Sequence, residues 1–314
     1  MKKAFFTLLM LAFATATFAQ DANDTIPMPK YWAHKGALGL NFSQSAFVNW
    51  AAGGQNALNW IATINYQINY AKGNFKWDNT FNASLGYSYY NFRKRPIKTD
   101  DKIEFTSLAG LKATEKLFYS LELAFRSQFA NGYNYEKDSI KPTSKFLAPA
   151  YITLGLGIEW VPNKIFSLNF APITGRITIV NDSILANEGA YGVEPGYFNP
   201  NESHAWIPGK HVRYEFGARL TAKVDVPIAK NVDFSSKLEL FSDYLHHPER
   251  VDVDWQNLFL LKVNSWLNCN LATHLIYDYD VPFYKTVDGE SVLIPGSKVQ
   301  FKEVLSIGLM FNLK

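Results

Sequence analysis

Apolar and polar residues alternate along most of this 314-residue chain. The stretch LNWIATINYQINY (58–70) has apolar or aromatic residues at its even positions, and most of its odd positions hold Asn, Thr or Gln. A period of two is typical of a half-buried β-strand. Twelve such segments are predicted at roughly 36–48, 57–70, 75–90, 102–113, 117–130, 150–161, 165–180, 211–226, 232–244, 251–263, 267–280 and 299–313.

The connections between these segments alternate in length. Short connections follow the second, fourth, sixth, eighth and tenth segments, whereas longer polar ones follow the third, fifth, seventh, ninth and eleventh. Outer-membrane barrels have short periplasmic turns and longer extracellular loops. We therefore predict an all-β fold, a closed antiparallel transmembrane β-barrel of about 12 strands. An even number of strands also places both ends of the barrel on the periplasmic side.

A soluble β-sandwich fits the sequence less well. The segments average about a dozen residues, near the ~9–11 that a tilted strand needs to cross a bilayer and longer than the ~5–6 of ordinary strands. Their polar faces carry Arg, Lys, Glu and Asp, which a packed protein core excludes. The apolar faces are therefore expected to meet lipid, while the charged faces line an interior. Because lipid cannot satisfy an open sheet edge, the last strand should pair with the first.

The N-terminus indicates export. Residues 1–19 (MKKAFFTLLMLAFATATFA) combine a basic start, an apolar run and small residues, as a secretory signal peptide does. Cleavage is expected after Ala19, which leaves residues 20–30 as a short periplasmic leader and 31–314 as a single barrel domain. The predicted location is the bacterial outer membrane. Six tryptophans at or near the ends of segments match the aromatic girdles of such barrels.

Charge and cysteine content limit the partners. Without Lys2 and Lys3 the 31 basic residues become 29, against 28 acidic ones, so nothing favours nucleic acid as a partner. The single cysteine, Cys269, permits neither an intramolecular disulfide nor a cysteine metal cluster. No cofactor or metal is predicted. The predicted partners are outer-membrane lipid and, if the lumen conducts, a small solute; the sequence does not identify a protein partner.

The inward faces of the predicted strands carry both signs of charge. Twelve strands spaced ~4.8 Å apart and tilted ~40° give a radius of roughly 12 Å, so long side chains leave a narrow pore or none. In one interpretation the charges form a polar path for a solute or ion. In the other they pair into salt bridges that fill the lumen. The candidate lumen-lining residues are Glu122, Arg126, Arg213, Glu215, Arg219, Lys223, Lys237, Glu239, His274 and Asp278.

Three functions fit this fold. The first is a narrow channel or transporter for small solutes, and the second is a non-conducting structural or docking barrel of the envelope. A membrane hydrolase is a third, but no catalytic motif occurs, His274 is expected to face inward, and the His246–His247 pair resembles ordinary loop residues, so no enzyme is predicted. The longest loop, 181–210, either constricts or caps the barrel or is simply solvated, and residues 184–190 could form one or two helical turns.

Several stretches are similar to a known family. FSQSAFVNWAAGGQNALN (42–59), APITGRITIVNDSILANEGAYGVEPG (171–196) and VDWQNLFLLKVNSWL (253–267) with LIYDYD (275–280) resemble a family of uncharacterised Bacteroidota proteins. That family is defined by a domain of unknown function and is regarded as an outer-membrane β-barrel. The resemblance extends from about residue 32 to the end. It implies the fold and the compartment, but no substrate, catalytic residue or partner.

Overall fold

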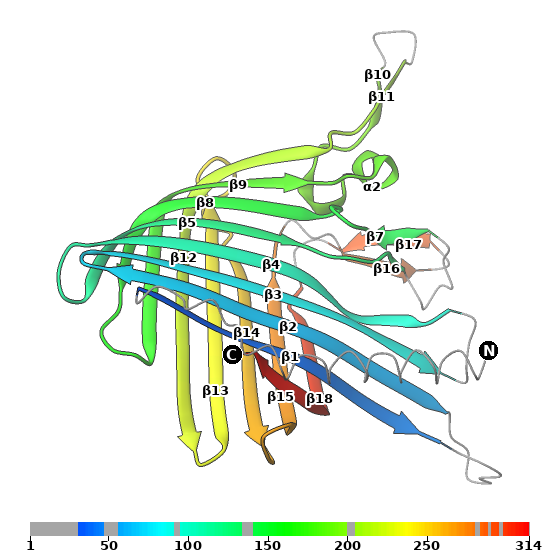
Figure 1. Ribbon diagram of the computed structural model, residues 1–314. Coiled ribbons are helices and arrows are strands. Elements are labelled where there is room, and N and C mark those ends of the chain that lie inside the picture. The colour runs from blue at the N-terminus through cyan, green and yellow to red at the C-terminus, as the bar shows by residue number, and fades with distance from the viewer. Residues whose placement is uncertain are drawn as a thin grey trace.

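A computed structural model describes residues 31–46, 56–90, 95–133, 141–199, 205–279, 283–287, 290–294 and 298–313. The predicted signal peptide (1–19) and leader (20–30) lie outside the described residues. The predicted barrel is confirmed, because twelve strands form one closed antiparallel sheet (Figure 1). They are β1 (Trp32–Ser45), β2 (Ala57–Lys72), β3 (Phe75–Tyr90), β4 (Ile97–Lys112), β5 (Leu117–Ser127), β8 (Ala150–Trp160), β9 (Phe166–Ile179), β12 (Val212–Ala229), β13 (Val232–Asp243), β14 (Asp252–Lys262), β15 (Leu267–Tyr277) and β18 (Gln300–Leu313).

The strands follow one another around the barrel in chain order, and β18 closes the circle against β1. The closing register runs from Gly36 opposite Leu313 to Phe42 opposite Ile307. This pairing supplies hydrogen-bond partners to strand edges that would otherwise be exposed. The short turns lie at the left and bottom of Figure 1, whereas the long connections gather at the opposite end. These two ends are called the turn end and the loop end below.

The long connections contain elements that the sequence pattern did not predict. Three two-stranded sheets lie outside the barrel: β6 (Gly132–Tyr133) with β7 (Pro142–Ser144), β10 (Tyr197–Asn199) with β11 (Ala205–Ile207), and β16 (Phe283–Val287) with β17 (Glu290–Ile294). Strands of two to five residues are too short to show a clear alternation. The largest boundary difference is at the fourth segment, because β4 begins at Ile97 instead of the predicted residue 102.

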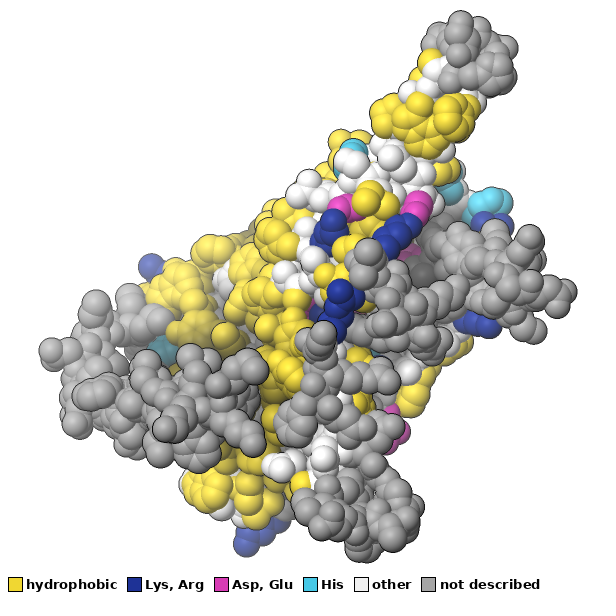
Figure 2. Space-filling model, turned by 90° about the vertical axis from the view of Figure 1, so that its right-hand side faces the viewer, with side chains coloured by type: hydrophobic (Ala, Val, Ile, Leu, Met, Phe, Trp, Pro, Cys, Tyr) yellow, Lys and Arg dark blue, Asp and Glu magenta, His cyan; other side chains and the backbone are white. Residues whose placement is uncertain are grey.

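The outer surface of the barrel is apolar. Tyr214 and Leu305 are each 69% exposed, and Leu156, Ile173 and the other large apolar side chains of the same faces are also exposed. Hydrophobic side chains cover much of the wall in Figure 2. None of the described helices is long and apolar enough to cross a membrane. A largely apolar wall around a charged interior is the reverse of a soluble barrel, and it fits a lipid environment.

Tryptophans lie near both ends of the barrel. Trp77 is the third residue of β3 near the turn end, Trp160 ends β8 there, and Trp255 lies near the loop-end start of β14; all three are exposed. Trp266 lies in the turn before β15 and is also exposed. This arrangement agrees with the predicted aromatic girdles, whereas Trp50 lies outside the described residues.

The loop 181–210 begins with the predicted helical turn. Helix α2 (Ser183–Asn187) is followed by a 3-10 turn, η2 (Ala190–Gly192), and by the β10–β11 hairpin, which projects away from the barrel (Figure 1). A small cluster of buried residues joins this loop to the connection before β8: Ala148, Val180, Leu185, Ala186 and Val193. The described part of the loop therefore packs on the barrel rim and extends outward.

Asp182 fixes the start of α2. Its Oδ1 accepts hydrogen bonds from the backbone N–H groups of Ile184 and Leu185, and its Oδ2 accepts one from Lys145 Nζ. Burial opposes ionisation, but Lys145 and the two amides outweigh it and hold the pKa of the Asp182 carboxyl below its usual value.

Removing this cap should loosen α2 only. Asp182→Ala is expected to cost about 1 kcal/mol of local stability. Because the folded pKa is depressed, the wild-type contribution is fully present above the unfolded pKa of about 3.9 and is lost as the pH falls from there through the lower folded pKa. Hydrogen exchange of residues 183–187 should therefore accelerate at low pH in the wild type, after correction for intrinsic rates. In Asp182→Asn, which keeps a capping side chain, the pH dependence should vanish; an unchanged profile would contradict this role.

Candidate functional site

Charged side chains from β4, β5, β12, β13 and β14, together with His274 on β15, meet inside the barrel and form one connected network. We call this network the lumen belt. Its members are Lys102, Glu104, Glu122, Arg126, Arg219, Lys237, Glu239, Asp254 and His274. The belt arises from strand alternation: residues two apart, such as Lys237 and Glu239 on β13, point to the same side of the sheet.

Several ion pairs of the belt span the lumen. Lys237 Nζ on β13 lies 2.6 Å from Glu104 Oε1 on β4, although four strands separate β13 from β4 along the shorter way around the barrel. Arg126 Nη1 on β5 lies 2.6 Å from Asp254 Oδ2 on β14, again across four intervening strands. Such contacts can form only through the interior. The lumen is therefore bridged by side chains at this level.

Arg219 lies at the centre of the belt. Its Nη1 is 2.9 Å from Glu122 Oε1, and its Nη2 is 2.9 Å from Glu239 Oε2. Asn169 Nδ2 donates to the second oxygen of Glu122 at 2.7 Å, and Asn169 Oδ1 accepts from Ser120. Arg219 is 8% exposed and Glu122 is 4% exposed. Charges so far from water are stable only when each has a charged or hydrogen-bonding partner, which this arrangement provides.

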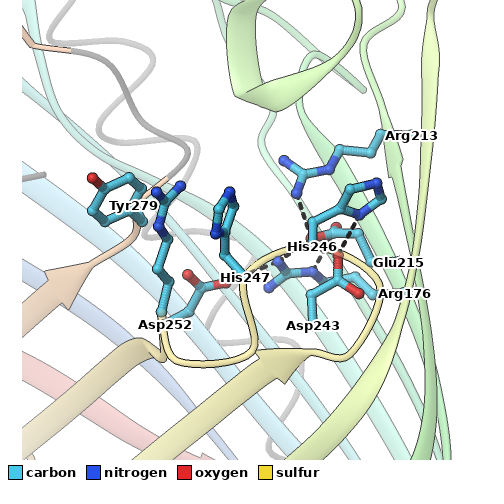
Figure 3. Close-up of a pocket in the computed structure, with 9 residues that line it drawn as sticks. Arg176, Arg213, Glu215, Asp243, His246, His247, Asp252 and Tyr279 are labelled. Carbon is cyan, nitrogen blue, oxygen red and sulfur yellow. Dashed lines mark hydrogen bonds and ion pairs between the residues drawn. The ribbon is translucent and has the colours of Figure 1, made fainter. Parts of the chain in front are cut away.

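A polar pocket lies between the belt and the loop end (Figure 3). We call it the vestibule, and its lining residues are Arg176, Arg213, Glu215, Asp243, His246, His247, Arg250, Asp252 and Tyr279. Arg176 binds Glu215 through two parallel contacts, Nε to Oε2 at 2.8 Å and Nη2 to Oε1 at 2.5 Å. The Nη2 atom also lies 2.8 Å from Asp252 Oδ2. This bidentate geometry fixes the guanidinium against the wall.

The loop between β13 and β14 forms one side of the vestibule (Figure 3). His246 Nδ1 lies 2.9 Å from Asp243 Oδ2, and His247 Nδ1 lies 3.0 Å from Glu249 Oε1. The guanidinium of Arg250 stacks over the ring of Tyr279 at 3.9 Å. Each histidine thus has its own carboxylate. Within the described ranges, no group of three or more His, Cys, Asp and Glu side chains is placed to hold a metal ion.

The ten candidate lumen-lining residues fall into three groups. The belt contains Glu122, Arg126, Arg219, Lys237, Glu239 and His274. The vestibule contains Arg213 and Glu215, whose Nη2 and Oε1 atoms lie 3.2 Å apart. The remaining two belong to neither: Lys223 lies on β12 nearer the turn end, and Asp278 follows the last residue of β15 instead of lying on a strand.

Two residues that hold these sites together were not among the candidates. Glu104 binds Lys237 across the lumen, and Arg176 anchors the vestibule. The apolar Leu108 shares the inward face of β4 with Glu104, which obscures the alternation there. Arg176 follows a bulge on β9, where the pairing with β12 shifts register between Gly217 and Arg219. His274, considered for hydrolysis, contacts Asp254 inside the belt, with Nε2 to Oδ1 at 3.0 Å.

A closed 12-strand barrel with an apolar exterior and a charged lumen defines the class of outer-membrane β-barrels. The sequence of residues 42–133 matches a family described as "Protein of unknown function (DUF3078)". The predicted resemblance to an uncharacterised family is thus confirmed; the stretch 42–59 lies within the match, and the stretches 171–196 and 253–280 lie outside it. No curated protein sequence matches this chain.

The fold is similar to solved outer-membrane proteins. The outer membrane channel COG4313 from Pseudomonas putida F1 is 10% identical with a TM-score of 0.38, over 93% of this chain and 99% of that one. The NanC porin is 10% identical with a TM-score of 0.36, over 89% and 100% of the two chains. The toluene transporter TodX from P. putida is 10% identical with a TM-score of 0.28, over 90% and 89%.

Proposed function

We propose that this protein is a narrow, gated channel of the bacterial outer membrane that the lumen belt closes in the conformation described here. Small polar solutes pass when the belt rearranges. The observation that carries this proposal is the pair of contacts Lys237–Glu104 and Arg126–Asp254, because they occlude the lumen with side chains of opposite walls. Side chains can exchange partners by rotamer changes while the backbone hydrogen bonds of the wall stay intact.

The vestibule is suited to be the place where a solute enters the barrel from the loop end. It combines three arginines with three carboxylates, so it is polar without favouring strongly one sign of charge. The protein reaches the outer membrane after removal of residues 1–19, and the short turns face the periplasm. The belt and vestibule members of the candidate set line the path of the solute.

A non-conducting structural barrel is the second candidate. Glu104 and Glu122 are each 4% exposed, which favours a lumen that is filled at this level. A permanently closed barrel would use the same ion pairs to stiffen its wall. Removing a cross-lumen pair distinguishes the two functions, because only a channel has a path that the pair obstructs.

The test is single-channel recording in planar bilayers with the double variant Glu104→Ala/Lys237→Ala. The double change keeps the net charge and removes the two side chains that join β4 to β13. We expect rare, small openings in the wild type and a several-fold larger conductance or open probability in the variant. The matched control is Asp233→Ala/Lys262→Ala, which removes an exposed pair at the turn end and should behave as the wild type. If both folded variants and the wild type never conduct, the channel is excluded and the structural barrel remains.

A further inference from the structure

Four polar side chains form a row on the lipid-facing side of the barrel. Ser236 on β13 lies opposite Asn257 on β14, Asn257 opposite Thr273 on β15, and Thr273 opposite Glu303 on β18. Directly opposed residues of neighbouring strands point to the same side of a sheet. The row shares that side with exposed apolar residues two positions away, including Trp255 on β14 and Phe301 and Leu305 on β18.

The row lies at a depth where polar groups are costly. Asn257 is five positions from the turn-end residue Lys262. With ~3.4 Å per residue and a tilt of ~40°, that places Asn257 about 13 Å above the turn end, near the middle of an apolar band ~25 Å tall. The row then rises toward the loop end, where Glu303 is exposed. An amide that finds no partner in hydrocarbon costs several kcal/mol.

Bonds within the wall satisfy only part of this row. Asn257 Nδ2 donates to Thr273 Oγ1 at 3.2 Å, and Trp255 Nε1 donates to Ser236 Oγ at 3.0 Å. An asparagine side chain offers two N–H donors and a carbonyl acceptor, and a threonine hydroxyl also has a proton to donate. Among the residues that the structure describes, the Asn257–Thr273 bond therefore leaves one amide N–H, the amide carbonyl and the hydroxyl proton for a partner outside the barrel. Lipid tails cannot serve any of them.

A second polar spot, on another wall of the barrel, is smaller. Trp77 Nε1 donates to Ser107 Oγ at 2.8 Å, and Asn79 Nδ2 donates to the backbone oxygen of Ile68. Asn79 lies opposite Ser107, so this spot covers two strands, not four, and it contains no carboxylate. The row on β13 to β18 is the more extended feature.

We propose that the outer face of β13, β14, β15 and β18 is the contact surface for a second copy of this chain in the membrane. Barrels in one bilayer share an orientation, so two identical faces meet around a two-fold axis along the membrane normal. An axis that passes between Asn257 and Thr273 brings each Asn257 opposite Thr273 of the second copy. Amide and hydroxyl are each donor and acceptor, so the pairing is self-complementary and satisfies the groups that lipid leaves unpaired. Glu303 lies at the rim of this contact, nearest the polar headgroups.

The test is cysteine cross-linking in intact outer membranes. Native Cys269 is on the same strand, so it is first replaced in Cys269→Ser. In that background Thr273→Cys should be joined rapidly into a dimer by a short bifunctional thiol reagent, because the two introduced thiols flank the axis and each lies opposite Asn257 of the second copy, too far apart for a direct disulfide. Leu121→Cys is the matched control, because Leu121 is an exposed residue of β5 on the opposite side of the barrel; it should cross-link several-fold more slowly.

A second variant distinguishes an outer face that contacts a second copy of the chain from one that contacts only lipid. Asn257→Leu/Thr273→Val removes the polar groups while keeping similar volume, so the barrel should fold with unchanged or higher stability in detergent. We expect the wild type to have the mass of a dimer in a mild detergent and the double variant to be monomeric. Equal cross-linking rates at positions 273 and 121, a monomeric wild type, or a cross-linked product heavier or lighter than two copies would overturn the proposal.

Discussion

Arg219→Met is expected to lower the free energy of unfolding of the barrel by about 3–5 kcal/mol, the usual result of breaking a buried ion pair from one side. Arg219 bridges Glu122 and Glu239, each through a 2.9 Å contact. After the substitution Glu122, which is 4% exposed, keeps Asn169 as its one side-chain hydrogen-bond donor within the described part of the chain. Methionine fills much of the space but supplies no charge. The lost free energy of unfolding therefore comes mainly from the buried Glu122 carboxylate that has lost its charged partner, and less from the missing contact itself.

A double-mutant cycle tests that reason. Glu122→Gln removes the charge that Arg219→Met leaves behind, so the double variant should recover most of the lost stability. Lys262→Met is the control, because Lys262 and Asp233 form an exposed pair at the turn end that is worth at most about 1 kcal/mol. The measurement is guanidinium unfolding in detergent or vesicles followed by tryptophan fluorescence. A loss in Arg219→Met no larger than in Lys262→Met would show that the belt is solvated and does not close the lumen.

Most of the barrel wall could be predicted from the sequence, because the alternation of apolar and polar residues indicates which face of each strand meets lipid. The eighth segment is clear: Tyr214 and Phe216 are exposed outward, whereas Glu215 and Arg219 are buried inward, as their spacing predicts. The pairing of the last strand with the first was predicted separately, from the need of backbone N–H and C=O groups for partners in lipid. Loop elements such as α2 and the β10–β11 hairpin depend on packing against the rim, which leaves little periodic signal in a short segment.

The partners within the lumen could not be predicted in the same way. Alternation indicates that Lys237 and Glu104 point inward, but it does not show that they meet, since that depends on strand stagger and on the cross-section of the barrel. In the described conformation the charges of the belt pair across the lumen, as in the salt-bridge interpretation. The conductance test addresses the other interpretation, a polar path for a solute.

One inserted residue on β9 decides to which side of the barrel wall the Arg176 side chain points. On β9 the outward apolar positions are even up to Phe170 and odd from Ile173 onward, because a bulge intervenes. Without the bulge, Arg176 would have pointed into lipid; with it, Arg176 enters the vestibule and binds Glu215. The change of phase is visible in the sequence as Phe166, Leu168 and Phe170 followed by Ile173, Ile177 and Ile179. Bulges of this kind bend strands and redirect side chains next to functional sites.

Gly157→Ala is expected to disrupt this bulge and cost about 3 kcal/mol or more, at or beyond the usual upper end for overpacking. The pairing of β8 with β9 shifts register between Leu156 and Ile158, at Gly157 itself. A Cβ added there would lie 2.0 Å from the backbone oxygen of Phe170 and 2.6 Å from Cα of Ala171. These are backbone atoms, so no side-chain rotation can relieve the overlap, and the two strands must separate or change register.

Gly175→Ala is the matched control for that variant. Gly175 lies on β9 of the same sheet, and no atom lies within 4 Å of its added Cβ, so this change should be neutral or slightly stabilising. The folded fraction after refolding into detergent, read from the heat-modifiable migration of the barrel on a gel, measures both variants. A register change in Gly157→Ala would also move Arg176 out of the vestibule, so surviving folded protein should lose the conductance behaviour of the wild type. Equal folding of the two alanine variants would show that the wall tolerates a side chain at the bulge and that the orientation of Arg176 has another cause.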